Sequence, residues 1–413
     1  MAGLGGVGRV LATRNTQLYF GGSLLSWTGQ WVQKIATDWL AWELTHSPAW
    51  VGVVAFCNLA PSVVISPLAG AAADRLDRVK LTVVTQLVTA GHALVLATLV
   101  LTGLIRVEFM AALEVVLGTA QAFAMPARQS LIPALVGRAE LPGAVALNSL
   151  CFNLARSAGP AVGGVLVALW GVVPCLLTNM SAYLLASVTM PLLRLAAAAR
   201  RGHAPEKSVL RDAYEGVLYA ARHPGVGPLF LYAAALGVTV RSVPEMLPPF
   251  VDRLFSRGPE GLATLSSSIG LAALIGGLAV AAHGKVKGLV RVSIWGGMAL
   301  SLMAVGFVAT RSFAFATLCA GGMGMMTTVH GIAAQTLLQN STSRAMLGRM
   351  LSLWSMITRA GPALGALCYG TLAEVAGLRG PVLAGGALGL LACLWALGRA
   401  RRMALALEPP PAA

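Results

Sequence analysis

Long apolar segments separated by short polar ones fill the 413-residue chain. Most of the segments reach about 20 residues, the length at which an α-helix crosses the hydrocarbon core of a bilayer. Charged side chains are rare within them. The pattern predicts twelve transmembrane helices, at residues 18–44, 48–72, 80–104, 107–126, 143–169, 172–193, 226–250, 262–283, 289–309, 312–333, 348–374 and 380–400.

The composition supports the same class. Hydrophobic residues make up 57% of the chain and charged residues 11%, whereas soluble domains carry roughly 25% charged residues. The six cysteines all lie within apolar segments and form no Cys-x-x-Cys pair, which indicates packing residues rather than disulfides or metal ligands. We therefore predict an all-α membrane protein.

Lysine and arginine are distributed unevenly between the two sides of the predicted helices. With the N-terminus inside, 21 of the 30 basic residues, Arg128 among them, fall in cytoplasmic segments, five in outer loops and four within helices. This bias predicts a multi-pass protein of the cytoplasmic (inner) membrane with both termini in the cytoplasm. The net charge of +15 is then a consequence of topology. No nucleic-acid partner is predicted, because no basic face carries interleaved aromatic side chains.

The chain repeats itself by halves. Residues 156–164 read Arg-Ser-Ala-Gly-Pro-Ala-Val-Gly-Gly, and residues 359–365 read Arg-Ala-Gly-Pro-Ala-Leu-Gly. Lys34 and Asp38 likewise correspond to Arg241 and Glu245, each 207 residues later. Such repeats predict two six-helix bundles related by pseudo-twofold symmetry. The predicted domains are an N-terminal bundle at 1–194, a cytoplasmic linker at 195–225, a C-terminal bundle at 226–402 and a disordered tail at 403–413.

The basic linker contains apolar side chains at four-residue spacing. They are Val209, Ala213, Val217 and Ala221. This spacing predicts an amphipathic helix along the cytoplasmic surface of the membrane.

The segment between the second and third predicted helices reads Gly-Ala-Ala-Ala-Asp-Arg-Leu-Asp-Arg-Val-Lys at 70–80. It resembles the signature loop of the major facilitator superfamily at Gly70, Asp74, Arg75 and Arg78, while Asp77 replaces the usual glycine. The resemblance implies that Asp74 pairs across a cytoplasmic gate. Alternatively, the charges of the loop only fix the orientation of the protein.

The motif at 159–164, Gly-Pro-Ala-Val-Gly-Gly, resembles the core of the antiporter motif of drug exporters in the same superfamily, without its upstream glycines. Proline breaks a helix hydrogen bond and glycine permits close helix contact, so the motif is a candidate hinge; ordinary small-residue packing is the alternative. The hinge residues are Gly159, Pro160, Gly163 and Gly164, with Gly361 and Pro362 as their counterparts.

Three further stretches strengthen the likeness. Residues 31–39, the run 146–149 with Asn153 and Arg156, and residues 241–248 are similar to the bacterial exporters of enterobactin and macrolides, the transmembrane secretion effector family. The likeness covers most of residues 15–400. It implies a carrier fold, and its members export siderophores, antibiotics and other amphipathic molecules.

Charged residues inside the predicted helices are the candidates for proton coupling, because a charge in a bilayer is costly unless it is paired or hydrated. They are Asp38, Glu114, Lys34, Arg156, Arg241, Glu245 and Arg359. We expect Arg156 to hold Glu114, so that Asp38 is released to titrate, because a desolvated carboxylate can take up a proton. Structural ion pairs are the alternative reading. The candidates for the substrate pocket are Trp27, Trp31, Gln30, Asn153 and His330.

Enzyme chemistry is not predicted. The chain has no Gly-x4-Gly-Lys-Ser/Thr phosphate loop, and its six histidines show no metal-ligand spacing, so no cofactor or metal is expected. We predict a monomeric secondary transporter that exports an amphipathic small molecule by alternating access, driven by protons. An uptake or lipid-flipping carrier of the same fold, or a sensor or assembly protein without transport, are the alternatives.

Overall fold

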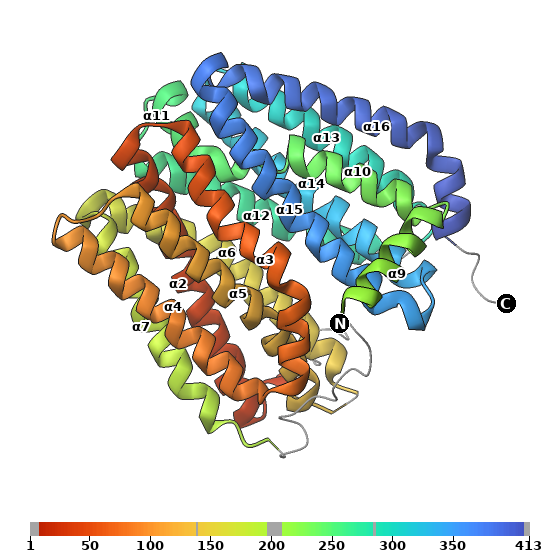
Figure 1. Ribbon diagram of the computed structural model, residues 1–413, viewed down its shortest axis with the longest axis horizontal. Coiled ribbons are helices and arrows are strands. Elements are labelled where there is room, and N and C mark those ends of the chain that lie inside the picture. Colours follow the sequence, from red (N-terminus) through yellow and green to blue (C-terminus); the bar gives the residue numbers. More distant parts are fainter. Residues whose placement is uncertain (1–7, 138, 196–208, 284–285, 409–413) are drawn as a thin grey trace. The chain divides into compact units, whose positions relative to one another are not determined.

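The computed structural model describes residues 8–137, 139–195, 209–283 and 286–408, and all regular structure in these ranges is helical (Figure 1). The longer helices are α2 (Arg14–Thr45), α3 (Pro48–Arg75), α4 (Arg78–Leu101), α5 (Val107–Leu135), α6 (Leu141–Trp170), α7 (Val172–Thr189), α9 (Val209–Arg222), α10 (Val226–Thr239), α11 (Leu247–Phe255), α12 (Pro259–His283), α13 (Leu289–Ala309), α14 (Phe313–Ser341), α15 (Arg344–Ala376) and α16 (Arg379–Leu407). Short 3-10 helices η1 (Met190–Leu192) and η2 (Val243–Met246) follow α7 and precede α11.

Nine segments of the described chain are long and apolar enough to cross a membrane, and one of them contains α10, η2 and α11 together. Helices α2, α14 and α15 are also long, with 32, 29 and 33 residues. Their polar side chains keep them below the hydropathy that the nine segments reach. The prediction of twelve spans requires that these three helices cross the membrane as well.

The chain divides into two compact units that differ from the predicted bundles. The first unit contains residues 1–44, 64–206 and 259–267, and the second contains 45–63, 207–258 and 268–413. The beginning of α3 therefore packs with the second unit and the beginning of α12 with the first. The predicted boundaries at 194 and 226 did not anticipate this exchange of helix ends.

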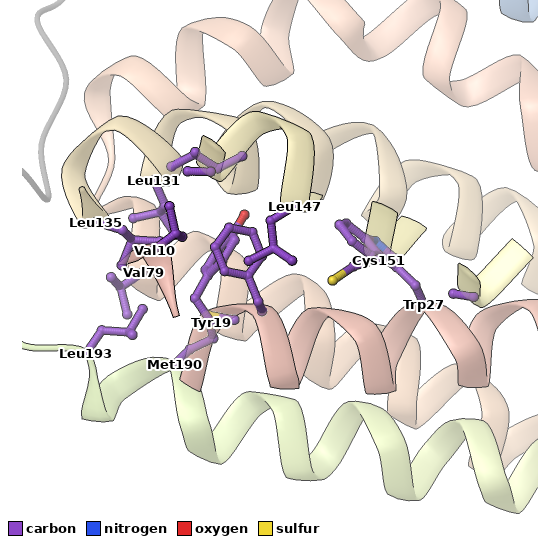
Figure 2. Packing of buried hydrophobic residues seen from close by; sticks show 14 residues of the cluster. Val10, Tyr19, Trp27, Val79, Leu131, Leu135, Leu147, Cys151, Met190 and Leu193 are labelled. Carbon is purple, nitrogen blue, oxygen red and sulfur yellow. The ribbon is translucent and has the colours of Figure 1, made fainter. Parts of the chain in front are cut away.

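An apolar core fills one end of the first unit (Figure 2). Tyr19 and Trp27 of α2 point toward Leu147 and Cys151 of α6, and Met190 closes the cluster from η1. All five side chains are buried. This core fixes α2, which carries five of the predicted site residues of the unit: Trp27, Gln30, Trp31, Lys34 and Asp38.

The predicted seventh helix is interrupted, as its prolines indicated. Helix α10 ends at Thr239, η2 begins at Val243, and α11 runs from Leu247 to Phe255. Proline lacks an N–H and cannot continue a regular helix from within, so the break lies next to Pro244.

Helix α5 extends further than predicted. Helix α5 continues through Pro126 and Pro133 to Leu135, beyond the predicted end at 126. This places Arg128 within a helix rather than in a cytoplasmic loop. The chain tolerates these prolines because neighbouring helices cover the freed backbone groups.

The predicted disordered tail is wrong for residues 403–408. Helix α16 runs to Leu407, and the carboxylate of Glu408 accepts hydrogen bonds from the N–H groups of Gly288 and Val290, each at 2.8 Å. The carboxylate thereby satisfies donors at the start of α13, where a negative charge is favourable. Residues 409–413 lie outside the described part of the chain.

The linker helix is confirmed from Val209 to Arg222, as α9. Its Glu215 pairs with Arg349 of α15 at 3.0 Å, and Gly216 and Ala220 are buried. Of the predicted apolar stripe, Val217 and Ala221 are exposed. The remainder of the linker, 196–208, lies outside the described residues.

Candidate functional site

One face of α2 carries the polar and aromatic residues that the sequence selected. Gln30, Trp31, Lys34 and Asp38 follow one another at helical spacing and are all half-buried. Side chains three and four residues apart share a helix face. The face is thus polar within a unit whose core is apolar.

Lys34 and Asp38 form the ion pair that their spacing predicted. The Lys34 ammonium lies 3.0 Å from one carboxylate oxygen of Asp38, and the two side chains are 35% and 18% exposed. Both partners are partly exposed, and an ion pair with this exposure contributes little to stability.

Glu114 occupies a different environment. It is 3% exposed, and its carboxylate lies 3.6 Å from Nε2 of His92 on α4. The other ring nitrogen of His92 lies 3.2 Å from the Gln33 amide nitrogen, and Asn179 of α7 donates to the Gln33 oxygen. This buried chain joins four helices of the first unit. Its members His92, Gln33 and Asn179 were not predicted from the sequence.

The partner predicted for Glu114 was Arg156. The structure places Glu114 beside His92, and the guanidinium of Arg156 lies 5.8 Å from the ring centroid of Trp31. A cation over an aromatic face is favourable. The pair of Glu114 with Arg156 stays a prediction.

An aromatic cluster connects α2 with α6. Phe152 packs edge-on against Trp27 and Trp31, with ring centroids at 5.5 and 6.4 Å. Asn153, the next residue on α6, is half-buried and donates to the Ser149 carbonyl. Phe152 was not selected from the sequence, because a single phenylalanine in an apolar helix carries no distinguishing signal.

The glycines of the predicted hinge mark close contacts. A Cβ at Gly159 would lie 2.4 Å from the Trp31 Cβ, and one at Gly163 would lie 2.8 Å from the Val32 carbonyl oxygen. Both therefore hold α6 directly against α2. A Cβ at Gly164 would meet Ala263 of α12 at 2.0 Å, so α6 also packs against the beginning of α12.

The repeat in the second unit makes the equivalent contacts. Gly361 lies against Gly237 of α10, where an added Cβ would be 2.7 Å from the Gly237 Cα, and a Cβ at Gly365 would be 2.3 Å from the Val238 carbonyl oxygen. Pro362 lies within α15 as Pro160 lies within α6. The two copies of the motif thus serve the same helix pair in each half of the chain.

The charged candidates of the second unit are more dispersed. Arg241 follows α10 in the turn before η2, Glu245 lies in η2, and Arg359 is half-buried on α15. His330 is fully buried, with Nδ1 2.9 Å from the Ser293 hydroxyl and its ring against Tyr232. The ring of His330 is thus enclosed by protein in this conformation, and its role in the pocket stays a prediction.

The beginning of α3 is held within the second unit by hydrogen bonds and close packing. The Ser47 hydroxyl donates to the Glu374 carboxylate, which also accepts from the Ala49 N–H at 3.3 Å. Gly52 lies against the Ala366 carbonyl, and a Cβ there would be 2.4 Å from its oxygen. Glycine permits this approach of α3 to α15.

The residues of the predicted gate loop are placed in part. Asp77 is the N-cap of α4, and its carboxylate accepts from the N–H groups of Val79 and Lys80 at 2.9 and 3.1 Å. Arg78 donates to the Ser130 carbonyl at 3.2 Å, and Arg75 is exposed. Gly70 and Asp74 lie in the last turns of α3, but their side chains are outside the described residues.

A groove of about 520 Å³ lies beside Gly164, between α6 and the first turns of α12. Its lining is mainly apolar and includes Glu260, Thr264 and Ser267. None of the predicted pocket residues lines this groove.

Helices long enough to span a bilayer, repeated glycine–proline contacts and charges within the spans define a membrane carrier of the major facilitator fold. The chain belongs to the transmembrane secretion effector family, whose profile matches residues 14–406. Both the predicted fold class and the predicted family are thereby confirmed.

Curated relatives and a solved structure agree with this assignment. The chain is 24% identical to the staphyloferrin A transporter of Staphylococcus aureus over 88% of this chain and 90% of the relative. It is 26% identical to the multidrug efflux pump Tap of Mycolicibacterium fortuitum, with the same coverage of both chains. A crystal structure of a POT peptide transporter superposes with a TM-score of 0.76 at 13% identity, over 95% of each chain, which shows the shared fold.

Proposed function

We propose that the protein exports an amphipathic small molecule across the cytoplasmic membrane, driven by inward proton movement. The family and the names of two relatives, a siderophore transporter and a multidrug efflux pump, support the export of a small molecule. The observation that carries proton coupling is the half-exposed Lys34–Asp38 pair on the α2 face. The protein acts as a monomer, with both termini in the cytoplasm.

Asp38 is the coupling carboxylate in this proposal. Water reaches its side chain, and Lys34 stabilises the ionised form across 3.0 Å. Protonation of Asp38 removes the negative charge that attracts Lys34 and so weakens the pair. A coupling group needs this ability to alternate between two states, because a ligand shifts a conformational equilibrium only through its different affinity for each state.

Glu114 has a supporting role. Its contact with His92 is buried, and His92 in turn contacts Gln33. Gln33 lies on α2 one residue before Lys34. The buried chain therefore fixes the position of α2 along its axis and its rotation, and with them the positions of Lys34 and Asp38.

Transport into inverted membrane vesicles tests this function. A panel of amphipathic compounds that includes a macrolide and a carboxylate siderophore is added to vesicles that hold a proton gradient. Export coupled to protons predicts that a transported compound dissipates the gradient in vesicles with the wild-type protein and not in vesicles without it. A gradient that stays unchanged while the compound accumulates would contradict proton coupling.

A further inference from the structure

Arg128 is a buried cation that the coupling proposal does not use. It lies on α5, where the helix continues past its predicted end, and the residue is 5% exposed. Ionisable side chains inside membrane proteins are costly and generally have a function. Its surroundings therefore indicate what it could bind.

Three side chains surround the guanidinium. One terminal nitrogen donates to the Ser26 hydroxyl at 3.2 Å, and the guanidinium carbon lies 5.8 Å from the ring centroids of both Trp27 and Tyr183. The Nε–H group is buried and has no acceptor among the described residues. No carboxylate in that part of the chain forms an ion pair with Arg128.

Among the described residues, the guanidinium is thus buried without a counter-ion. Aromatic faces and one hydroxyl compensate a buried guanidinium only in part. The unpaired Nε–H and the adjacent terminal N–H form the planar edge that binds a carboxylate through two parallel hydrogen bonds. Trp27 and Tyr183 would then cover the apolar part of the same molecule.

The arginine lies one layer of side chains behind the α2 face. The Tyr183 hydroxyl donates to the Gln30 side-chain oxygen at 3.1 Å, and Trp27 packs against Phe152. Gln30 and Phe152 are half-buried. A shift of Trp27 or Tyr183 would therefore connect Arg128 with the half-exposed face.

We propose that Arg128 binds the carboxylate of an amphipathic substrate, with Trp27 and Tyr183 as the walls of this subsite. The proposal rests on the export function proposed above and names the chemical class of its substrate. It predicts that the carrier distinguishes an amphipathic acid from the neutral amide of the same molecule.

Equilibrium binding tests the proposal without transport. The full-length protein in phosphatidylcholine nanodiscs is titrated with 11-(dansylamino)undecanoic acid and with its carboxamide. We expect the acid to bind about tenfold more tightly than the amide, since a charge-assisted bidentate contact is lost in the amide. Arg128→Gln should abolish the difference, and Arg128→Lys should retain part of it.

Arg106→Gln is the matched control. Arg106 is an exposed arginine at the other end of the same helix, so its substitution should leave the preference for the acid unchanged. Equal binding of acid and amide to the wild-type protein, or no binding of the acid, would overturn the proposal. An unchanged preference in Arg128→Gln would do the same.

Two further measurements exclude other roles. Arg128→Met removes a buried charge, so the ligand-free protein should unfold at an equal or higher temperature. A lower unfolding temperature together with an unchanged preference for the acid would mean that Arg128 has a structural role, which contradicts the proposal. In nanodiscs with phosphatidylglycerol, displacement of the acid that depends on Arg128 would assign the site to a lipid phosphate instead. A preserved preference in a protein that transports nothing would support the subsite and overturn the export function.

Discussion

Two carboxylates of the first unit, Asp38 and Glu114, differ in their access to water, and this difference separates their roles. Asp38 shares a half-exposed face with Lys34, whereas Glu114 is buried with His92. A buried group that loses its partner leaves polar atoms without hydrogen bonds, which costs about 1–3 kcal/mol. An exposed pair contributes at most about 1 kcal/mol.

The first prediction follows from this contrast. Glu114→Leu should lower the free energy of unfolding by about 1–3 kcal/mol, because Glu114 is buried and its interactions, the contact with His92 among them, are lost. Asp38→Asn should change the stability by less than about 1 kcal/mol. Thermal unfolding of the two variants in the same detergent measures the difference, and equal losses would contradict the assignment of Glu114 to a supporting role.

The second prediction concerns the two aspartates of the loop after α3. Asp74→Asn should impair transport more than Asp77→Asn, because Asp74 holds the position of the gate charge in the resemblance, while Asp77 caps α4. Asparagine caps helices as well as aspartate does, and Asp77→Ala should cost about 1 kcal/mol of stability. Initial transport rates at matched expression give the comparison. A normal rate for Asp74→Asn would argue against the gate.

At the scale of elements, the two Gly-Pro motifs bring α6 onto α2 and α15 onto α10 through backbone contacts. The third prediction is that Gly163→Leu is destabilising, by about 1–3 kcal/mol, because the space beside the Val32 carbonyl is already filled. Gly21→Ala on α2 is the control, since an added Cβ there meets nothing within 4 Å. Unfolding temperatures of both variants provide the measurement; a Gly163→Leu protein as stable as the wild type would show that α6 does not need this close contact.

The fourth prediction concerns the joint between α9 and α10. His223 Nδ1 accepts from the N–H groups of Gly225 and Val226, each at 3.2 Å, and burial lowers the pKa of His223. A histidine with a lowered pKa in the folded state contributes stability above its ordinary value of about 6.5, and this contribution is lost as the pH falls through the lowered pKa.

Hydrogen exchange of the Gly225 and Val226 amides between pH 7.5 and pH 4.5, values chosen to bracket roughly the histidine range, tests this joint. Protection, corrected for the intrinsic pH dependence of exchange, should fall as the pH is lowered. In His223→Asn the side-chain oxygen can accept at every pH, so protection should stay level. A wild-type protein with level protection would refute the switch.

The sequence could predict the elements far better than their contacts. Apolar runs identify the spans, and Pro244 identifies the break after α10, because both depend on local chemistry. The end of α5 was missed because a proline removes a helix hydrogen bond and commonly ends a helix, whereas α5 continues through Pro126 and Pro133. The partner of Glu114 was missed because His92 is an isolated histidine in an apolar helix, and only the packing of α4 against α5 brings the two together.

At the scale of the whole molecule, two helices each belong to both units. The first turns of α3 pack with the second unit and those of α12 with the first. The sequence repeat predicted two halves, but it did not predict that the first turns of α3 and α12 pack with the other unit. A repeat indicates which helices correspond, and it carries no information on how their ends pack. Proton-driven alternating access needs the protonation of Asp38 to change the side to which the carrier is accessible.

Asp38→Asn gives the most direct test of that connection. The fifth prediction is that this variant loses uphill transport driven by a proton gradient and keeps substrate counterflow, because counterflow needs binding and alternation without net proton movement. Both assays use proteoliposomes and a compound that the wild-type protein transports, with Glu245→Gln as the matched carboxylate variant. Uphill transport by Asp38→Asn at the wild-type rate would contradict the account.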